Sequence, residues 1–209
     1  MAGRVQYQKI VKYLAAVTCT APLHIGSSAG DKGDVLVHPV ENVPFLQATG
    51  IAGVFREYYE RQYGSKDAEE LFGAMCQNEN GGEQESRVKF SDGIFAESVL
   101  EYRPRVRINR DTGTCDASGI RGTDKKAGHK FSMEYVGEGA KVNFAVYLYD
   151  ESKAERLECV FAALHKGALQ IGGQKSNGCG CFSVDGLHKI TFDLTTQKGR
   201  SRWSEEDSL

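Results

Sequence analysis

The sequence has no CxxC pair, no long hydrophobic run and no large excess of either charge. Its six cysteines are spread along the chain. Together with the absence of a secretory signal pattern, this favours a reduced, cytoplasmic protein with free thiols. The apolar runs are too short to cross a membrane, so we expect no membrane partner. Cys179 and Cys181 do not have the spacing of a zinc motif, and zinc is not favoured as a cofactor.

Charge is distributed unevenly, although the net charge is only −2. Residues 103–130 carry eight Lys and Arg against three Asp, and residues 57–85 carry eight acids against two basic residues. A basic segment can meet a polyanion, and an acidic one can meet a basic neighbour such as another copy of the chain. Two solvated surfaces explain the same pattern, so charge alone does not decide the function.

The stretch 172–180 contains four glycines. Glycine-rich loops let backbone N–H groups come close to an anion, because no Cβ blocks the approach. Lys175 adds a positive charge, and Gln174, Ser176 and Asn177 add neutral donors. The pattern therefore predicts a cradle for phosphates, although a tight connection between two elements would also explain the glycines.

The order of elements around these glycines argues against a nucleotide-binding P-loop. A P-loop runs from strand to loop to helix, with its lysine at the start of the helix. Here residues 151–168 have helical periodicity, and residues 181–184 and 189–194 alternate as strands do. No helix N-terminus follows the glycines, so a nucleotide site assisted by a helix dipole is not expected.

The remaining patterns predict an α+β fold. Strand patterns cover residues 4–20, 87–91 and 130–149, and helical patterns cover residues 49–63, 67–73 and 151–168. This order is typical of a ferredoxin-like (RRM-like) βαββαβ core. We expect a single domain over residues 1–209, with no internal repeat.

Residues 102–130 are predicted to form an inserted, thumb-like basic hairpin. Arg103, Arg105 and Arg107 alternate along a strand and so share one face of it. Asp111 begins a turn that returns the chain. The hairpin would present a stripe of positive charge.

Several segments together resemble one family. They are residues 22–27 (PLHIGS), residues 35–56, residues 71–73 with 87–92, residues 110–113 and the glycine loop at 171–180. On these segments the chain is identified as a member of the RAMP superfamily of CRISPR-associated proteins. It resembles most the backbone subunit of type III effector complexes.

This resemblance implies a subunit that oligomerises along a CRISPR guide RNA and contacts complementary target RNA. Its expected partners are that guide, the target, other copies of itself and other CRISPR effector subunits. Ala52 stands where the family motif has a lysine, so Gly50 and Gly53 are expected to compensate by close backbone approach. The expected RNA-binding residues are Gly26, Ser27, Gly50, Gly53, Arg56, Arg105, Arg107, Ile108, Gly172, Gly173, Gln174, Lys175, Ser176, Asn177 and Gly178.

The resemblance also implies a metal-dependent ribonuclease whose aspartate follows the first strand. The candidates here are Asp31 and Asp34, and Asp34 is favoured because it adjoins a short strand pattern at residues 35–37. Mg²⁺ or another divalent cation would be the cofactor if the subunit cleaves. The residues themselves leave two alternatives open. One is a non-catalytic RNA-binding scaffold, and the other is a stand-alone guide-processing endoribonuclease with His24 as its base.

Overall fold

The computed structural model describes residues 7–26, 34–74, 84–106 and 130–206, and the other residues lie outside this description. Strands and helices alternate along the chain in the order expected for an α+β protein. In chain order they are β1 (Lys9–Cys19), β2 (Phe45–Leu46), α1 (Ala48–Tyr63), α2 (Ser65–Phe72), β3 (Val88–Phe90), β4 (Gly93–Glu97), β5 (Leu100–Val106), β6 (Lys130–Val136), β7 (Lys141–Leu148), the 3₁₀ turn η1 (Glu151–Lys153), α3 (Ala154–His165), the 3₁₀ turn η2 (Lys175–Asn177), β8 (Phe182–Asp193) and α4 (Gln197–Glu206).

The main sheet is antiparallel throughout. Its spatial order is β2–β4–β7–β1–β8, and β3 shares with β4 the edge of β7 that faces away from β1. The central strand β1 pairs with β7 on one side and with β8 along nearly its whole length on the other. The predicted α+β class is therefore confirmed.

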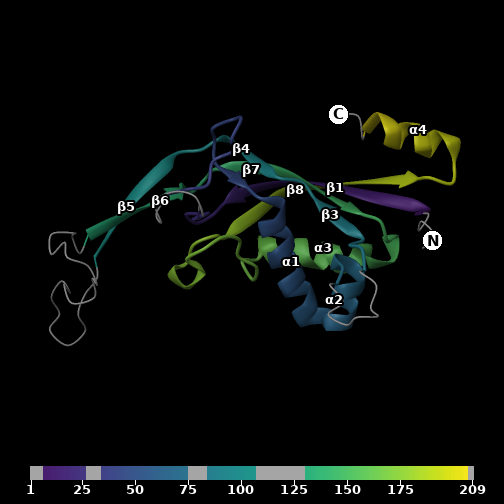
Figure 1. Cartoon of the computed structure of the whole chain (residues 1–209), viewed down its shortest axis with the longest axis horizontal. Helices are drawn as coiled ribbons and strands as arrows, with labels where there is room; N and C mark the ends of the chain where they lie inside the picture. The colour runs from purple at the N-terminus through teal and green to yellow at the C-terminus, as the bar shows by residue number, and fades with distance from the viewer. Residues whose placement is uncertain (1–6, 27–33, 75–83, 107–129, 207–209) are drawn as a thin grey trace.

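Three helices cover one face of this sheet, with α1, α2 and α3 below it in Figure 1. Alternate residues of β1 point to these helices, so Val11 and Tyr13 are fully buried. The ring of Phe55 from α1 lies 5.1 Å from that of Phe161 from α3, and Phe161 lies 5.8 Å from Tyr13. Burial of each such side chain contributes about 1.5–3 kcal/mol, so this aromatic cluster fixes both helices on the sheet.

Helix α4 lies on the opposite face, near the end of the sheet where β1 begins (Figure 1). The ring of Trp203 lies 5.2 Å from Phe192 of β8 and 5.9 Å from Tyr147 of β7. Glu206 forms an ion pair with Lys12, which is itself buried. The sequence did not predict this helix, because a single large apolar residue on a polar segment gives no helical period.

Most of the other elements follow the sequence patterns, although β2 and β4 were not predicted and the strand expected at residues 35–37 is present only as isolated bridges. The three helical patterns correspond to α1, α2 and α3, and α1 and α2 each end at a glycine with positive φ. The two strand patterns at 181–184 and 189–194 are parts of one continuous strand, β8, with a bulge opposite Ala16 and Val17. Among the described helices, none combines the length and the hydropathy needed to cross a lipid bilayer.

Strands β5 and β6 form a separate two-stranded sheet that extends away from the main one (Figure 1). They pair antiparallel from Leu100 opposite Val136 to Val106 opposite Lys130. The sequence predicts a hairpin over residues 102–130, and these two strands stand at the two ends of that range. Residues 107–129 lie outside the described part, so the tip of the thumb and the single-domain boundaries stay predictions.

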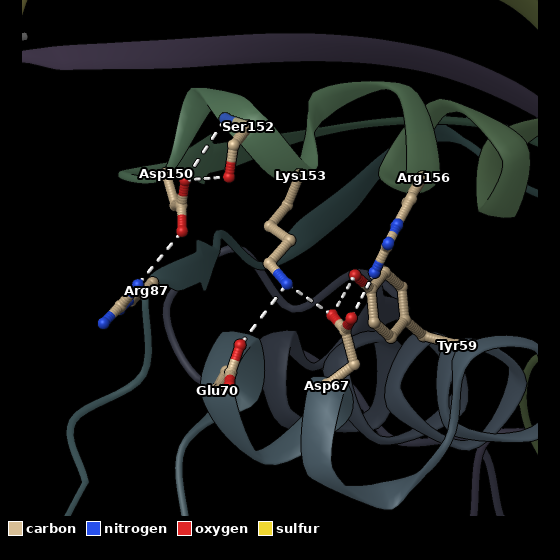
Figure 2. A network of polar contacts seen from close by, with 8 residues as sticks. All are labelled: Tyr59, Asp67, Glu70, Arg87, Asp150, Ser152, Lys153 and Arg156. Carbon is tan, nitrogen blue, oxygen red and sulfur yellow. Dashed lines mark hydrogen bonds and ion pairs between the residues drawn. The ribbon is translucent and has the colours of Figure 1, made fainter.

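Polar side chains join α1 and α2 to η1 and α3, and a second set of contacts links Arg87, just before β3, to Asp150 (Figure 2). Asp67 of α2 accepts hydrogen bonds from Tyr59 at 2.9 Å and Lys153 at 2.6 Å, and it also pairs with Arg156. Burial opposes the charge of this carboxylate, but the hydrogen bonds from Lys153, Arg156 and Tyr59 outweigh it and lower the pKa of Asp67 to about 2. The network therefore stabilises the fold only while Asp67 is ionised.

Asp67→Asn is expected to lower the free energy of unfolding by about 2 kcal/mol at neutral pH. The depressed pKa means that the stabilisation is complete above about pH 4 and is lost as the pH falls toward about 2. Denaturant titrations at several pH values should show that the variant lacks this acid-dependent loss. Glu70→Gln is the matched control, because Glu70 contacts the same Lys153 at 3.4 Å with a more exposed side chain. An equal loss in both variants would contradict the central role of Asp67.

Candidate functional site

Residues 22–26, which follow β1, lie between β6 and the glycine loop at 171–180. Leu23 exchanges two backbone hydrogen bonds with Val136 of β6, at 2.9 and 2.8 Å. On the other side, Gly173 N–H donates to the carbonyl of His24 at 2.8 Å, and Gly180 N–H donates to that of Pro22 at 3.0 Å. Two motifs that are far apart in the sequence therefore form one structural unit.

Two of the loop glycines are required by contacts inside the protein. A Cβ on Gly172 would lie 2.6 Å from the carbonyl oxygen of His24, and a Cβ on Gly180 would lie 2.0 Å from that of Ile171. Both glycines also have positive φ, 91° and 81°, which favours glycine over any other residue. The loop thus has the tight-connection role that the sequence left open, in addition to any role in binding.

The tip of the loop is exposed. Gln174 adopts the left-handed conformation (φ 59°) and is followed by the turn η2, whose side chains Lys175, Ser176 and Asn177 are exposed. Within the described residues, the backbone N–H groups of Gln174, Lys175 and Ser176 have no acceptor. Successive free N–H groups beside a lysine can bind an anion, so the tip retains the chemistry of a phosphate cradle.

Arg105 connects the β5–β6 hairpin to this loop. Its guanidinium is half-buried and donates to Gln174 Oε1 at 3.2 Å and to the hydroxyl of Tyr135 at 2.6 Å. Gln174 Oε1 also accepts from Asn177 Nδ2 at 2.6 Å. The sequence predicts that Arg105 contacts RNA. In the structure its guanidinium contacts Gln174, which fixes the orientation of that side chain.

His24 is a packed side chain. It is only 7% exposed, and its Nδ1 lies 3.0 Å from the backbone oxygen of Glu134. Its ring lies 5.4 Å from that of Tyr135, and Gly173 covers its edge. A buried imidazole held in this way positions the loop and is poorly placed to take a proton from a substrate.

Asp34 lies at the exposed end of a short antiparallel pair. Gly26 and Val35 form an isolated bridge, and Leu36 N–H donates to the carbonyl of Ile25 at 2.9 Å. The carboxylate of Asp34 is exposed, while Val35 beside it is buried. The chain therefore fixes the backbone at Asp34 and leaves its side chain open to a ligand.

Sequence reasoning missed Glu134, although it lies next to this aspartate. Glu134 is 8% exposed, and its Oε2 accepts a hydrogen bond from Val35 N–H at 2.8 Å. Its hydrogen bond with Tyr102, together with its charge, raises the pKa of that tyrosine above the ordinary value. Glu134 lies between Met133 and Tyr135, which are also buried, so no alternation in the sequence indicates its burial.

The expected contacts on α1 lie along its exposed surface. A Cβ on Gly50 or Gly53 would meet nothing within 4 Å, so packing inside the protein does not require glycine there. Each glycine inside a helix costs roughly 0.5–1 kcal/mol relative to alanine, which fits a surface that something outside approaches closely. Arg56 is half-buried and lines a groove of about 590 Å³ together with Phe72 and Ser86.

The described residues contain no group of three or more His, Cys, Asp or Glu that could hold a metal ion. Cys179 packs with Met133 and Tyr135, and Cys181 accepts a hydrogen bond from Gln170. Among the described residues, Asp34 is not part of such a group. Mg²⁺ commonly binds through one or two carboxylates and the phosphates of a substrate.

Some expected site residues lie outside the described part of the chain. They are Ser27, Asp31, Arg107 and Ile108. Among the described ones, Asp34, Arg105 and the glycine loop lie together, next to residues 22–26 and β6. Gly50, Gly53 and Arg56 form a second group on α1.

Comparison with known proteins assigns the family. The profile of the RAMP superfamily matches residues 16–183, which is more than half of the chain. The chain belongs to the RAMP superfamily, as its motifs predict.

A solved structure gives the same fold. The cryo-EM structure of the type III-B Cmr-beta bound to cognate target RNA contains a chain that superimposes with a TM-score of 0.66 at 20% sequence identity. The match covers 87% of this chain and 61% of that one, so this chain spans about three fifths of its length. No curated protein sequence matches the chain.

Proposed function

We propose that the chain is a guide-RNA-binding backbone subunit of a type III CRISPR effector complex. The observation that carries this proposal is the tip of the glycine loop, in a chain of the RAMP superfamily. There Lys175 is exposed, and the backbone N–H groups of Gln174, Lys175 and Ser176 have no acceptor among the described residues. The structural likeness to a chain of a type III-B complex supports the assignment to a type III complex. We further propose that the core is of the ferredoxin-like kind, which the strand order β8–β1–β7–β3/β4 supports.

Binding of this kind recognises the sugar-phosphate backbone of RNA and does not depend on the base sequence. Backbone N–H groups and a lysine recognise phosphate oxygens, which are the same at every nucleotide. The bare surface of α1 at Gly50 and Gly53, with Arg56 on the same helix, supplies a second place where the guide approaches. Each copy then holds a short segment of guide, and head-to-tail contacts between copies extend the assembly.

We infer that the subunit also cleaves target RNA, with Asp34 as the catalytic residue. In such a reaction the 2′-hydroxyl of the target attacks the adjacent phosphorus, and the 5′-oxygen of the next nucleotide leaves. The products are a 2′,3′-cyclic phosphate and a 5′-hydroxyl. Asp34 is exposed on a fixed backbone and can orient the attacking hydroxyl and accept its proton. A bound divalent cation would neutralise the charge on the phosphate.

A guide-processing endoribonuclease is less well supported, because its candidate base His24 is buried and hydrogen-bonded to Glu134. A non-catalytic scaffold would share every RNA contact and lack only cleavage.

Purified chain mixed with guide RNAs of increasing length is expected to give a ladder of assemblies on size-exclusion chromatography. Lys175→Ala should weaken binding and reduce the slope of log affinity against log salt by about 0.7 for each phosphate that the variant no longer neutralises. Lys198→Ala is the matched control, because Lys198 is also exposed but lies on α4 away from the glycine loop. A single species at every guide length would contradict the backbone proposal, and equal salt slopes in both variants would contradict the phosphate cradle.

A further inference from the structure

We propose that Glu134 is a positioning residue that holds Asp34 in place through the backbone of Val35. This inference rests on the proposed catalytic role of Asp34. It starts from a carboxylate that is 8% exposed on β6 and whose Oε2 accepts a hydrogen bond from Val35 N–H at 2.8 Å.

The burial of Glu134 needs a reason. A carboxylate is costly to bury, and a hydrophobic side chain of similar size would pack a strand at least as well. Within the described residues, no lysine or arginine forms an ion pair with Glu134. Its carboxylate accepts the hydrogen bond from Val35 N–H instead. Hydrogen bonds to an ionised acceptor are about twice as strong as neutral ones, and this one fixes the backbone next to Asp34.

Glu134 contacts both chain segments that flank residues 27–33. Its side chain binds Val35 on one segment, while its backbone oxygen lies 3.0 Å from Nδ1 of His24 on the other. The same residue therefore sets the position of Asp34 relative to His24, whose carbonyl accepts from Gly173 of the glycine loop. A catalytic carboxylate needs a fixed distance from the bound RNA, and this arrangement provides it from one point on β6.

Three variants separate positioning from charge. Glu134→Gln keeps an oxygen at the same reach, Glu134→Asp keeps the charge on a shorter side chain, and Glu134→Ala removes both. Single-turnover cleavage in complexes reconstituted with guide RNA is expected to fall about a hundredfold in Glu134→Ala and Glu134→Asp, because a displacement of about 1 Å costs this much. Glu134→Gln is expected to keep at least about a tenth of the rate, since its neutral bond is about half as strong. Target affinity should not change.

Hydrogen exchange at the amide of Val35 supplies a readout that is independent of cleavage. It should become faster in Glu134→Asp and Glu134→Ala and stay slow in Glu134→Gln. Two results would overturn the proposal. One is cleavage at the wild-type rate in Glu134→Asp, and the other is a rate in Glu134→Gln as low as in Glu134→Ala. Asp34→Asn in the same assay tests the proposed function separately: if it cleaves normally, the catalytic role fails, and the exchange data alone decide whether Glu134 holds Val35.

Discussion

Complexes assembled from Asp34→Asn subunits are expected to bind target RNA with unchanged affinity and to leave it uncut. The loss should be at least about a hundredfold in single-turnover rate, because a positioned base contributes about 10²–10⁴ to such reactions. The structure supports this size of effect, since the side chain of Asp34 is exposed while Val35 and Leu36 fix its backbone. Target RNA labelled at its 5′ end would show the loss of regularly spaced cuts on a denaturing gel.

Asp31→Asn is the matched control, because Asp31 is the other acidic candidate between the first strand and residue 35. We expect it to cleave at close to the wild-type rate. If Asp31→Asn abolishes the cuts and Asp34→Asn does not, the assignment between the two residues is wrong. If wild-type complexes bind target RNA and never cut it, in the presence of Mg²⁺ or Mn²⁺, the subunit is a scaffold.

Gly180→Ala is expected to destabilise the protein by about 2–5 kcal/mol. The added Cβ would lie 2.0 Å from the carbonyl oxygen of Ile171, so the backbone must shift, and overpacking of this kind costs about 1–3 kcal/mol. The positive φ of 81° adds about 1–2 kcal/mol for a residue with a Cβ. Urea denaturation, with the midpoint and slope compared between variant and wild type, measures the loss.

Gly178→Ala separates the two contributions. Gly178 has nearly the same φ, 77°, but a Cβ there would meet nothing within 4 Å. This variant should lose only about 1–2 kcal/mol, the cost of the left-handed conformation. Equal losses at the two positions would mean that the close approach to Ile171 has no energetic consequence.

Much of the fold can be predicted from the sequence, because its signals are local. The apolar period along residues 49–63 predicts α1, and the alternation in residues 4–20 predicts β1, since each pattern reflects one buried face. Helix α4 could not be predicted in this way. Its apolar anchor, Trp203, packs on Tyr147 and Phe192 from two different strands, and no local period encodes that contact.

The candidate site also has parts that the sequence predicts and parts that it does not. The glycine loop, the turn at 22–27 and the aspartates after the first strand are visible as motifs, and the RAMP family follows from them. The contacts that give these motifs their geometry cannot be predicted from the sequence. Arg105 alternates with its neighbours like a solvent-facing arginine, yet its guanidinium binds Tyr135 and Gln174.

By itself, the sequence determined the α+β class, the order of most of the elements, the family and the residue types available for binding phosphate and for catalysis. Only the tertiary structure decided that Gly172 and Gly180 serve close packing, that His24 is buried, and that Glu134 lies beside Val35. The physical reason is the distance along the chain over which each signal acts. Propensity and periodicity act over a few residues, whereas the burial of a side chain depends on segments that the fold brings together from distant parts of the chain.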